Sequence, residues 1–170
     1  MKIDIGPLRL DEAEALASLA REIWHAHFPA IISRAQIDYM LDQRYKPGLI
    51  RQLLARGDLW LAARAGDELV GFAHGMALQE GDFKLDRLYV SGPWQRHGIG
   101  GELIARVADH ARRHGCTRLL LRVNRQNQQA IDAYLKHGFK VATLIVEDIG
   151  KGFVMDDYVM VKDIQSDAPA

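Results

Sequence analysis

Hydrophobic and polar positions follow two different periods in the first half of the chain. Between residues 13 and 55, apolar residues recur every three or four positions, which predicts a series of short helices. From residue 59 to residue 78 the period becomes two. Gly66-Asp67 interrupts this alternating segment as a tight turn, so the segment predicts an antiparallel hairpin.

The starts of two of these helices carry local signals. Asp11 with Glu14, and Ser33 with Gln36, have the spacing of capping boxes, in which side chains satisfy the first free N–H groups of a helix. Further along the chain, strands alternate with helices. Strands are predicted at residues 3–8, 85–90, 118–123, 139–146 and 153–161, with one helix from residue 99 to Gly115 and another around Tyr134.

These elements predict an α/β (α+β) domain with a mixed sheet and helices on both faces. The strand at residues 118–123 follows a helical crossover, so it is expected to run parallel to the strand at residues 85–90. We expect a single domain over residues 1–164 and a frayed polar tail at residues 165–170.

Composition narrows the possible partners. Lys plus Arg number 22 and equal Asp plus Glu, so no overall charge favours nucleic acid or a membrane surface. Cys116 is the single cysteine, which excludes an internal disulfide, and His110 with His114 lacks a third metal ligand. The chain contains no apolar run of membrane length, so we expect a soluble cytoplasmic protein without a metal.

The segment between the strand at residues 85–90 and the helix that follows predicts an anion site. A helix N-terminus there exposes backbone N–H groups and the positive end of the helix dipole. Gly98, Gly100 and Gly101 let a ligand approach the backbone, and Gln95 and Arg96 add side-chain donors. The segment fits neither a Walker loop nor the dinucleotide fingerprint. A phosphate or pyrophosphate ligand is expected, although glycines that only permit tight helix packing would give the same pattern.

Two motifs give these residues a family context. Gln95, Gly98 and Gly100 form Q-x-x-G-x-G, and residues 127–139 read N-x-x-A-x-x-x-Y-x-x-x-G-F. Together they resemble the GNAT superfamily of acyl-CoA-dependent N-acetyltransferases. The resemblance implies a mostly antiparallel twisted sheet of about six to seven strands with a splayed parallel pair at its centre.

The resemblance also implies acetyl-CoA as co-substrate and assigns roles to particular residues. The main chain of residues 88–90 would pair with the pantetheine arm, and the N–H of Tyr89 or Val90 would polarise the thioester carbonyl. The implied cofactor contacts are Leu88, Tyr89, Val90, Gln95, Arg96, His97, Gly98, Ile99, Gly100, Gly101, Asn124 and Asn127.

Two side chains are candidates for the proton transfers. Tyr134 stands where the family places the acid that protonates the departing thiolate, although it could simply pack on its helix. Asp86 is the candidate base, because Lys84 occupies a position where relatives often have a glutamate. Asp86 could instead pair with a neighbour such as Arg87. Other candidate bases are Glu147, Asp148, Asp156 and Asp157.

The acceptor is the least determined part of the prediction. Trp24, His27 and Phe28 lie in the region that forms one wall of the family's acceptor site, although aromatic residues are equally common in cores. A small amine or polyamine, or a protein N-terminus, is the expected acceptor. A non-catalytic acyl-CoA sensor and a nucleotide-binding regulator are alternatives from other classes, and a homodimer is possible.

Overall fold

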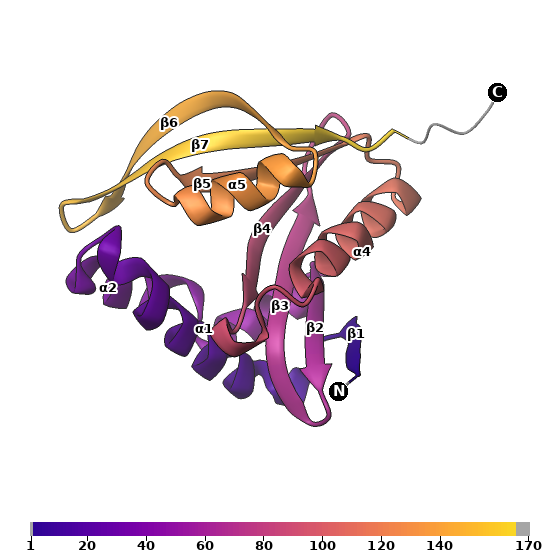
Figure 1. Cartoon of the computed structure of the whole chain (residues 1–170), viewed down its shortest axis with the longest axis horizontal. Helices are drawn as coiled ribbons and strands as arrows, with labels where there is room; N and C mark the ends of the chain where they lie inside the picture. The colour runs from indigo at the N-terminus through magenta and orange to yellow at the C-terminus, as the bar shows by residue number, and fades with distance from the viewer. Residues whose placement is uncertain (1, 166–170) are drawn as a thin grey trace. The chain divides into compact units, whose positions relative to one another are not determined.

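A computed structural model of the chain describes residues 2–165, so the predicted tail beyond Gln165 lies outside the described residues. Figure 1 shows the helices and strands of the chain and labels most of them. They are β1 (Ile3–Pro7), η1 (Leu10–Glu12), α1 (Ala13–His27), η2 (Phe28–Ala30), α2 (Arg34–Arg44), α3 (Pro47–Ala55), β2 (Leu59–Ala65), β3 (Glu68–Ala77), β4 (Asp82–Val90), η3 (Gly92–Trp94), α4 (Ile99–Arg113), β5 (Arg118–Asn124), α5 (Gln128–Lys136), β6 (Lys140–Gly150) and β7 (Phe153–Asp163).

The strands form a seven-stranded mixed sheet in the order β1-β2-β3-β4-β5-β7-β6. β5 is parallel to β4, whereas the β1–β2, β2–β3, β5–β7 and β6–β7 pairs are antiparallel. Within the described residues, the register of β4 and β5 covers only three pairs, from Asp82–Arg118 to Lys84–Leu120. Both strands continue beyond that point, β4 to Val90 and β5 to Asn124. The predicted fold class is confirmed.

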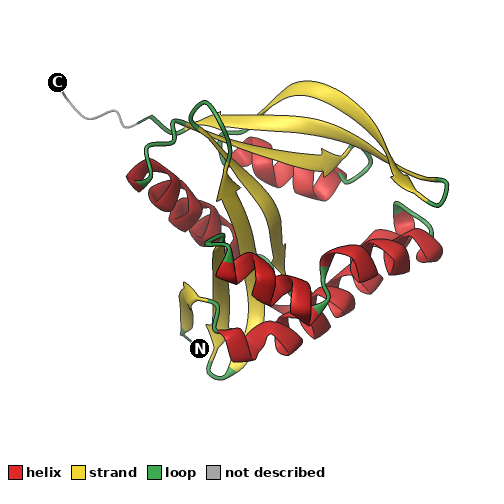
Figure 2. Cartoon of the chain, turned by 180° about the vertical axis from the view of Figure 1, so that it is seen from behind, coloured by secondary structure: helices red, strands yellow, loops and turns green. Residues whose placement is uncertain are grey.

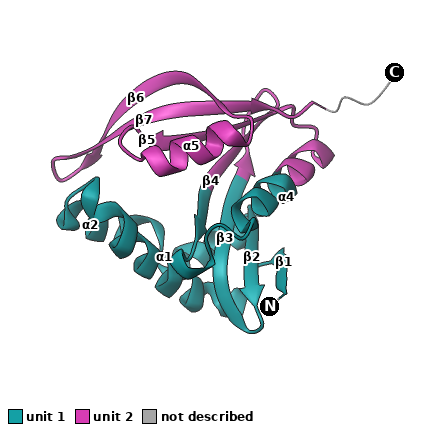
Figure 3. Ribbon diagram, in the orientation of Figure 1, with its two compact units in different colours: residues 1–75, 87–107 teal, residues 76–86, 108–170 magenta. Residues whose placement is uncertain are grey.

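The chain divides into two compact units, coloured separately in Figure 3. Unit 1 comprises residues 1–75 and 87–107, and unit 2 comprises residues 76–86 and 108–170. β3, β4 and α4 each contribute residues to both units. The predicted single domain over residues 1–164 stays a prediction.

In unit 1, α1 packs against α2 and α3, which follow it before β2 begins (Figure 2). The capping box predicted from Asp11 and Glu14 is wrong. Glu12 lies between them, and its Oε1 accepts a hydrogen bond of 2.8 Å from the Arg9 N–H, while Glu14 pairs with Arg51. The cap predicted at Ser33 is confirmed, since its Oγ accepts a 3.1 Å hydrogen bond from the Gln36 N–H.

In unit 2, β5, β6 and β7 form an antiparallel part of the sheet. On β5, Leu119, Leu121 and Val123 are buried, and the residues that alternate with them are not. β6 extends to Gly150, past the predicted end at residue 146, because Glu147 and Asp148 continue to pair with β7 although neither residue type favours strands. None of the helices in residues 2–165 has both the length and the apolar character needed to cross a membrane.

Candidate active site

The anion loop, residues 95–101, begins beside the end of β4 and leads into α4. The Gln95 Nε2 donates to the Val90 carbonyl oxygen at 3.1 Å, and the His97 Nδ1 donates to the Gln95 carbonyl oxygen at 2.8 Å. Arg96 and Gly98 have φ values of +65° and +79°, so the backbone turns through the left-handed region twice before the helix starts. These contacts fix the path of the loop from within unit 1.

From Arg96 onward, the backbone donors of the anion loop are unused inside the described chain. The first hydrogen bond of α4 runs from the Glu102 N–H to the Gly98 carbonyl oxygen, at 3.1 Å. None of the N–H groups from Arg96 to Gly101 donates to another described residue. Orphan donors at a helix N-terminus, together with the helix dipole, favour an anion such as phosphate.

Packing within the chain does not require glycine at positions 98 and 100. A Cβ atom built at Gly98 or Gly100 would meet no atom of the described residues within 4 Å. Position 98 requires glycine because its φ is positive, but the backbone at Gly100 has no such requirement. The packing alternative raised by the sequence is therefore not supported for Gly100, whose backbone faces open space.

The end of β4 is held closely against β3. A Cβ at Gly71 would lie 3.1 Å from the Tyr89 carbonyl oxygen, and the Ser91 N–H donates to the Val70 carbonyl oxygen at 2.8 Å. Leu88, Tyr89 and Val90 are half-buried. This anchoring fixes the backbone of the residues predicted to hold the acyl chain.

The Tyr89 ring belongs to an aromatic cluster in unit 1, formed with Trp24, Phe28, Tyr45 and Phe72. Tyr89 has its ring centre 5.8 Å from that of Trp24 and 6.3 Å from that of Phe28. Trp24 and Phe28 are only 3% and 6% exposed, so they form part of the core as well as contacting β4. Tyr45 is not among the residues predicted from the sequence, because its ring contacts are with Trp24 and Phe72, which are distant in the sequence.

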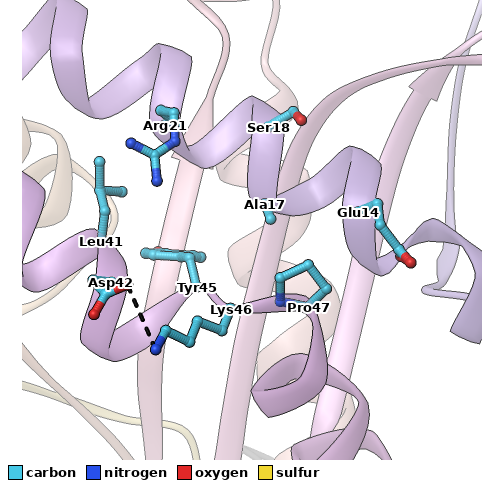
Figure 4. Close-up of a pocket in the computed structure, with 9 residues that line it drawn as sticks. All are labelled: Glu14, Ala17, Ser18, Arg21, Leu41, Asp42, Tyr45, Lys46 and Pro47. Atoms are coloured by element: carbon cyan, nitrogen blue, oxygen red, sulfur yellow. Dashed lines mark ion pairs between the residues drawn. The ribbon is translucent and has the colours of Figure 1, made fainter.

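A hollow of about 280 Å³ lies beside this cluster, between α1 and the segment that joins α2 to α3. Figure 4 shows the side chains that line it, with the Asp42–Lys46 ion pair at 3.6 Å. Glu14 and Arg21 of α1 add further charges, and Tyr45 lines the hollow as well as joining the aromatic cluster. None of the predicted site residues lines this hollow.

Unit 2 holds the other predicted residues. Tyr134 is half-buried, and its ring centre lies 5.5 Å from that of Phe139. Asn127 is buried and is the N-cap residue of α5, but its side chain makes no capping hydrogen bond. Its N–H instead donates to the Asn124 carbonyl oxygen at 2.9 Å, which fixes the turn between β5 and α5.

The candidate base Asp86 forms an ion pair with Lys84, with 3.3 Å between Oδ1 and Nζ. Arg87, the neighbour named as an alternative partner of Asp86, contacts His74. Lys84 pairs with Leu120 in the sheet, and Asn124 pairs with Asp157. Because side chains on a strand alternate between faces, this register puts Lys84, Asp86, Arg122, Asn124 and Asp157 on one face of the sheet in unit 2.

The acidic residues of β6 and β7 are mostly paired with two arginines. The Arg122 Nη1 donates to Glu147 at 2.5 Å and its Nε to Asp157 at 3.2 Å, while Arg125 pairs with Asp156 at 2.8 Å. Burial raises the pKa of the Asp157 carboxyl above its usual value. The charges of Asp156 and Glu147 also raise this pKa, whereas the charge and hydrogen bond of Arg122 lower it. The three carboxylates of Glu147, Asp156 and Asp157 therefore share two arginines.

The predicted residues thus form two groups, one in each unit. Trp24, His27, Phe28, the end of β4 and the anion loop lie in unit 1, and Asp86, Asn124, Asn127 and Tyr134 lie in unit 2. The model of the acetyltransferase (GNAT) family matches residues 15–139. The chain belongs to this family. The predicted recognition is confirmed, and the family assignment makes the chain an acetyl-CoA-dependent N-acetyltransferase.

Individual GNAT relatives match over nearly the whole chain. The spermidine N(1)-acetyltransferase of Thermoplasma acidophilum is 28% identical over 92% of this chain and 97% of its own. The peptidyl-lysine N-acetyltransferase YjaB of Escherichia coli is 30% identical over 90% of this chain and 93% of its own. Among solved structures, the PaiA N-acetyltransferase from T. acidophilum in complex with coenzyme A has a TM-score of 0.83 and 27% identity, covering 96% of this chain and 99% of that one. None of these similarities supports the non-catalytic alternative.

Proposed function

We propose that this enzyme transfers the acetyl group of acetyl-CoA directly to a primary amine of a small polyamine-type cation, with both substrates bound at once. The observation that carries the proposal is the anion loop, whose N–H groups from Arg96 to Gly101 have no partner in the described chain. A coenzyme A diphosphate supplies the acceptor oxygens that these donors lack.

The acyl end of the cofactor needs support at its carbonyl oxygen. The backbone of residues 88–90 is held by β3 and by the Gln95 side chain, so it offers N–H and C=O groups in a fixed arrangement. The N–H of Tyr89 or Val90 then donates to the carbonyl oxygen, whose negative charge grows as the amine attacks.

The transfer balances with three proton movements. The neutral amine attacks the thioester carbon, the C–S bond breaks, and the thiolate takes a proton from the Tyr134 hydroxyl. Ordinary pKa values near 10 and 8.5 make this proton transfer from Tyr134 unfavourable by about 2 kcal/mol, a small barrier for an enzyme. The nitrogen of the new amide gives up the extra proton that the attack left on it, and this proton restores the Tyr134 hydroxyl through water. The ammonium proton of the amine has to leave before attack.

Two carboxylates are candidates to receive the ammonium proton. Asp86 is the residue that we assign to this role, with its side chain 14% exposed and paired to Lys84. Asp157 lies on the same face, and its raised pKa makes it a stronger base than an ordinary aspartate. A water molecule between the amine and either carboxylate would complete the path.

The charge around Asp157 supports a cationic acceptor. Glu147 and Asp157 share the single guanidinium of Arg122, and Asp156 has Arg125. Burial is the main cause of the raised pKa of the Asp157 carboxyl. The charges of Asp156 and Glu147 also raise it, against the lowering effect of Arg122, so a bound cation would relieve the repulsion among the three carboxylates. An alkylammonium chain supplies this positive charge and does not require a peptide-binding surface.

The experiment measures release of the coenzyme A thiol over a panel of amines. We expect kcat/KM for spermidine or spermine to exceed that for a lysine peptide or a peptide N-terminus by about ten-fold or more, a difference of about 1.4 kcal/mol. Tyr134→Phe should lower kcat about ten- to thousand-fold with little change in the Kd of acetyl-CoA. Higher kcat/KM on the peptides would overturn the polyamine assignment, and full turnover in Tyr134→Phe would remove Tyr134 from the mechanism.

A further inference from the structure

A chain of buried polar groups runs through unit 1, outside every residue that the mechanism uses. The His74 Nε2 lies 2.7 Å from an Asp58 carboxylate oxygen, and the His74 Nδ1 lies 2.6 Å from the Arg87 Nη1. His74 is fully buried and Arg87 is 4% exposed. Buried charged groups are expensive unless they are paired, so this arrangement requires an explanation.

The guanidinium of Arg87 determines which groups donate and which accept in this series of hydrogen bonds. A guanidinium has only donors, so the His74 Nδ1 must accept from Arg87, and the His74 Nε2–H then donates to Asp58. His74 is therefore neutral in this arrangement. Burial raises the pKa of the Asp58 carboxyl, but hydrogen bonds from Arg56 and His74 outweigh burial and bring it below its usual value.

The other contacts of Arg87 reach a helix end and two aromatic rings. Its Nη2 donates at 2.9 Å to the carbonyl oxygen of Arg44, the last residue of α2, where helix carbonyls lack partners. The guanidinium carbon lies 5.1 Å from the ring centre of Tyr45 and 5.4 Å from that of Trp60. One side chain on β4 thus joins β3, the end of α2 and the aromatic cluster.

These contacts surround the part of β4 where the acyl chain is expected. Arg87 precedes Tyr89 by two residues on the same face of β4, and Tyr89 packs on Trp24, Phe28 and Phe72. A shift of the Arg87 backbone would carry the Tyr89 and Val90 N–H groups with it. Displacements of about 1 Å in a catalytic arrangement can lower the rate about a hundred-fold.

We propose that Arg87 is a positioning residue for acetyl transfer, held by neutral His74, and that it fixes the Tyr89 and Val90 backbone together with the aromatic cluster. This inference rests on the proposed function, in which the backbone of Tyr89 and Val90 orients the thioester. The Arg87 contacts given above are with His74, Arg44, Tyr45 and Trp60, which lie outside the anion loop, so Arg87 should influence turnover much more than coenzyme A binding.

Two substitutions of His74 separate its two hydrogen bonds. In His74→Asn the amide oxygen takes the place of Nδ1 and still accepts from Arg87, but the bond to Asp58 is lost. In His74→Gln the amide nitrogen reaches the place of Nε2 and still donates to Asp58, but the bond to Arg87 is lost. The two variants differ by one methylene group and remove the same ring.

We expect His74→Gln to lower kcat about ten- to hundred-fold, while the Kd of coenzyme A from calorimetry stays within about two-fold. His74→Asn should keep kcat within about three-fold of the wild-type value, because the Arg87 contact survives. Equal losses of kcat in both variants, or a normal kcat in His74→Gln, would overturn the positioning role. Absence of turnover in the wild-type enzyme would instead contradict the proposed function.

Arg87→Lys provides a second test if His74→Gln does not fold. Lysine keeps the charge but presents one donor group at a single point, so it cannot span the His74 Nδ1 and the Arg44 carbonyl oxygen as the planar guanidinium does. The expected result is a fall in kcat of about ten-fold or more with the Kd of coenzyme A unchanged. A wild-type kcat in this variant would count against the proposal.

Discussion

At the scale of single residues, the most informative feature is a glycine that the fold does not require. Gly100 lies in the first turn of α4 without a positive φ, and no atom of residues 2–165 comes within 4 Å of the place of its Cβ. Alanine is favoured over glycine in helices by up to about 1 kcal/mol. The presence of glycine there is better explained by a ligand than by the packing of the protein.

Gly100→Ala should therefore separate stability from binding. We expect the free energy of unfolding to stay unchanged or to rise by up to about 1 kcal/mol. The Kd of coenzyme A should rise about ten-fold, because the added methyl group keeps the diphosphate away from the backbone N–H groups. Urea unfolding and calorimetric titration measure the two quantities.

Gly48→Ala is the matched control for this prediction. Gly48 also lies in the first turn of a helix, α3, and a Cβ there would likewise meet no atom within 4 Å. This variant should show the same gain in stability with an unchanged Kd. An unchanged Kd in Gly100→Ala as well would contradict the role of the anion loop.

At the scale of elements, the start of α1 depends on an ion pair between distant parts of the chain. The Arg64 Nη2 and Nε donate to the two Glu12 carboxylate oxygens at 2.5 and 2.9 Å, and both side chains are 11% exposed. The hydrogen bond from Arg64 lowers the pKa of the Glu12 carboxyl below its usual value. The same carboxylate accepts the Arg9 N–H, so it joins β2 to the beginning of the helix.

Glu12→Gln should lower the free energy of unfolding by about 2–4 kcal/mol at pH 7, because Arg64 is left without its buried counter-charge. A folded-state pKa below the unfolded value near 4.3 means that Glu12 stabilises the fold above that pH. This stability is lost as the pH falls through the lowered folded-state pKa. Urea unfolding between pH 3 and pH 7 should therefore show the gap between wild type and variant closing in acid.

Glu14→Gln is the control for this element, since the exposed pair of Glu14 with Arg51 should contribute little. An equal effect of the two substitutions at pH 7 would mean that burial does not distinguish the two pairs. A gap for Glu12→Gln that stays constant down to pH 3 would contradict the assigned pKa direction.

The elements also show what could and could not be predicted from the sequence. The helices and the hairpin at Gly66-Asp67 were predicted because short-range period and turn residues determine them. The cap at Glu12 was missed because its arginine partner is 52 residues away. His74 was missed for the same reason, as its role depends on Asp58 before β2 and on Arg87 of β4. The anion loop, by contrast, is contiguous in sequence.

At the scale of the whole molecule, the open question is whether the two compact units unfold together. Covalent continuity favours a single transition, because β3, β4 and α4 each contribute residues to both units. Disrupting any of these elements would disturb both units at once. We expect the predicted domain of residues 1–164 to behave as one cooperative unit.

The positions of the tryptophans allow this expectation to be tested without mutation. All three, Trp24, Trp60 and Trp94, belong to unit 1, so their fluorescence reports on that unit, whereas far-ultraviolet circular dichroism reports on both. The two probes should give the same urea midpoint and the same slope. Coenzyme A at about 100 times its Kd should shift both midpoints equally, by a stabilisation of about 2.7 kcal/mol. A fluorescence transition that separates from the circular dichroism transition would mean that unit 1, which contains the anion loop, unfolds independently of unit 2, which contains Tyr134.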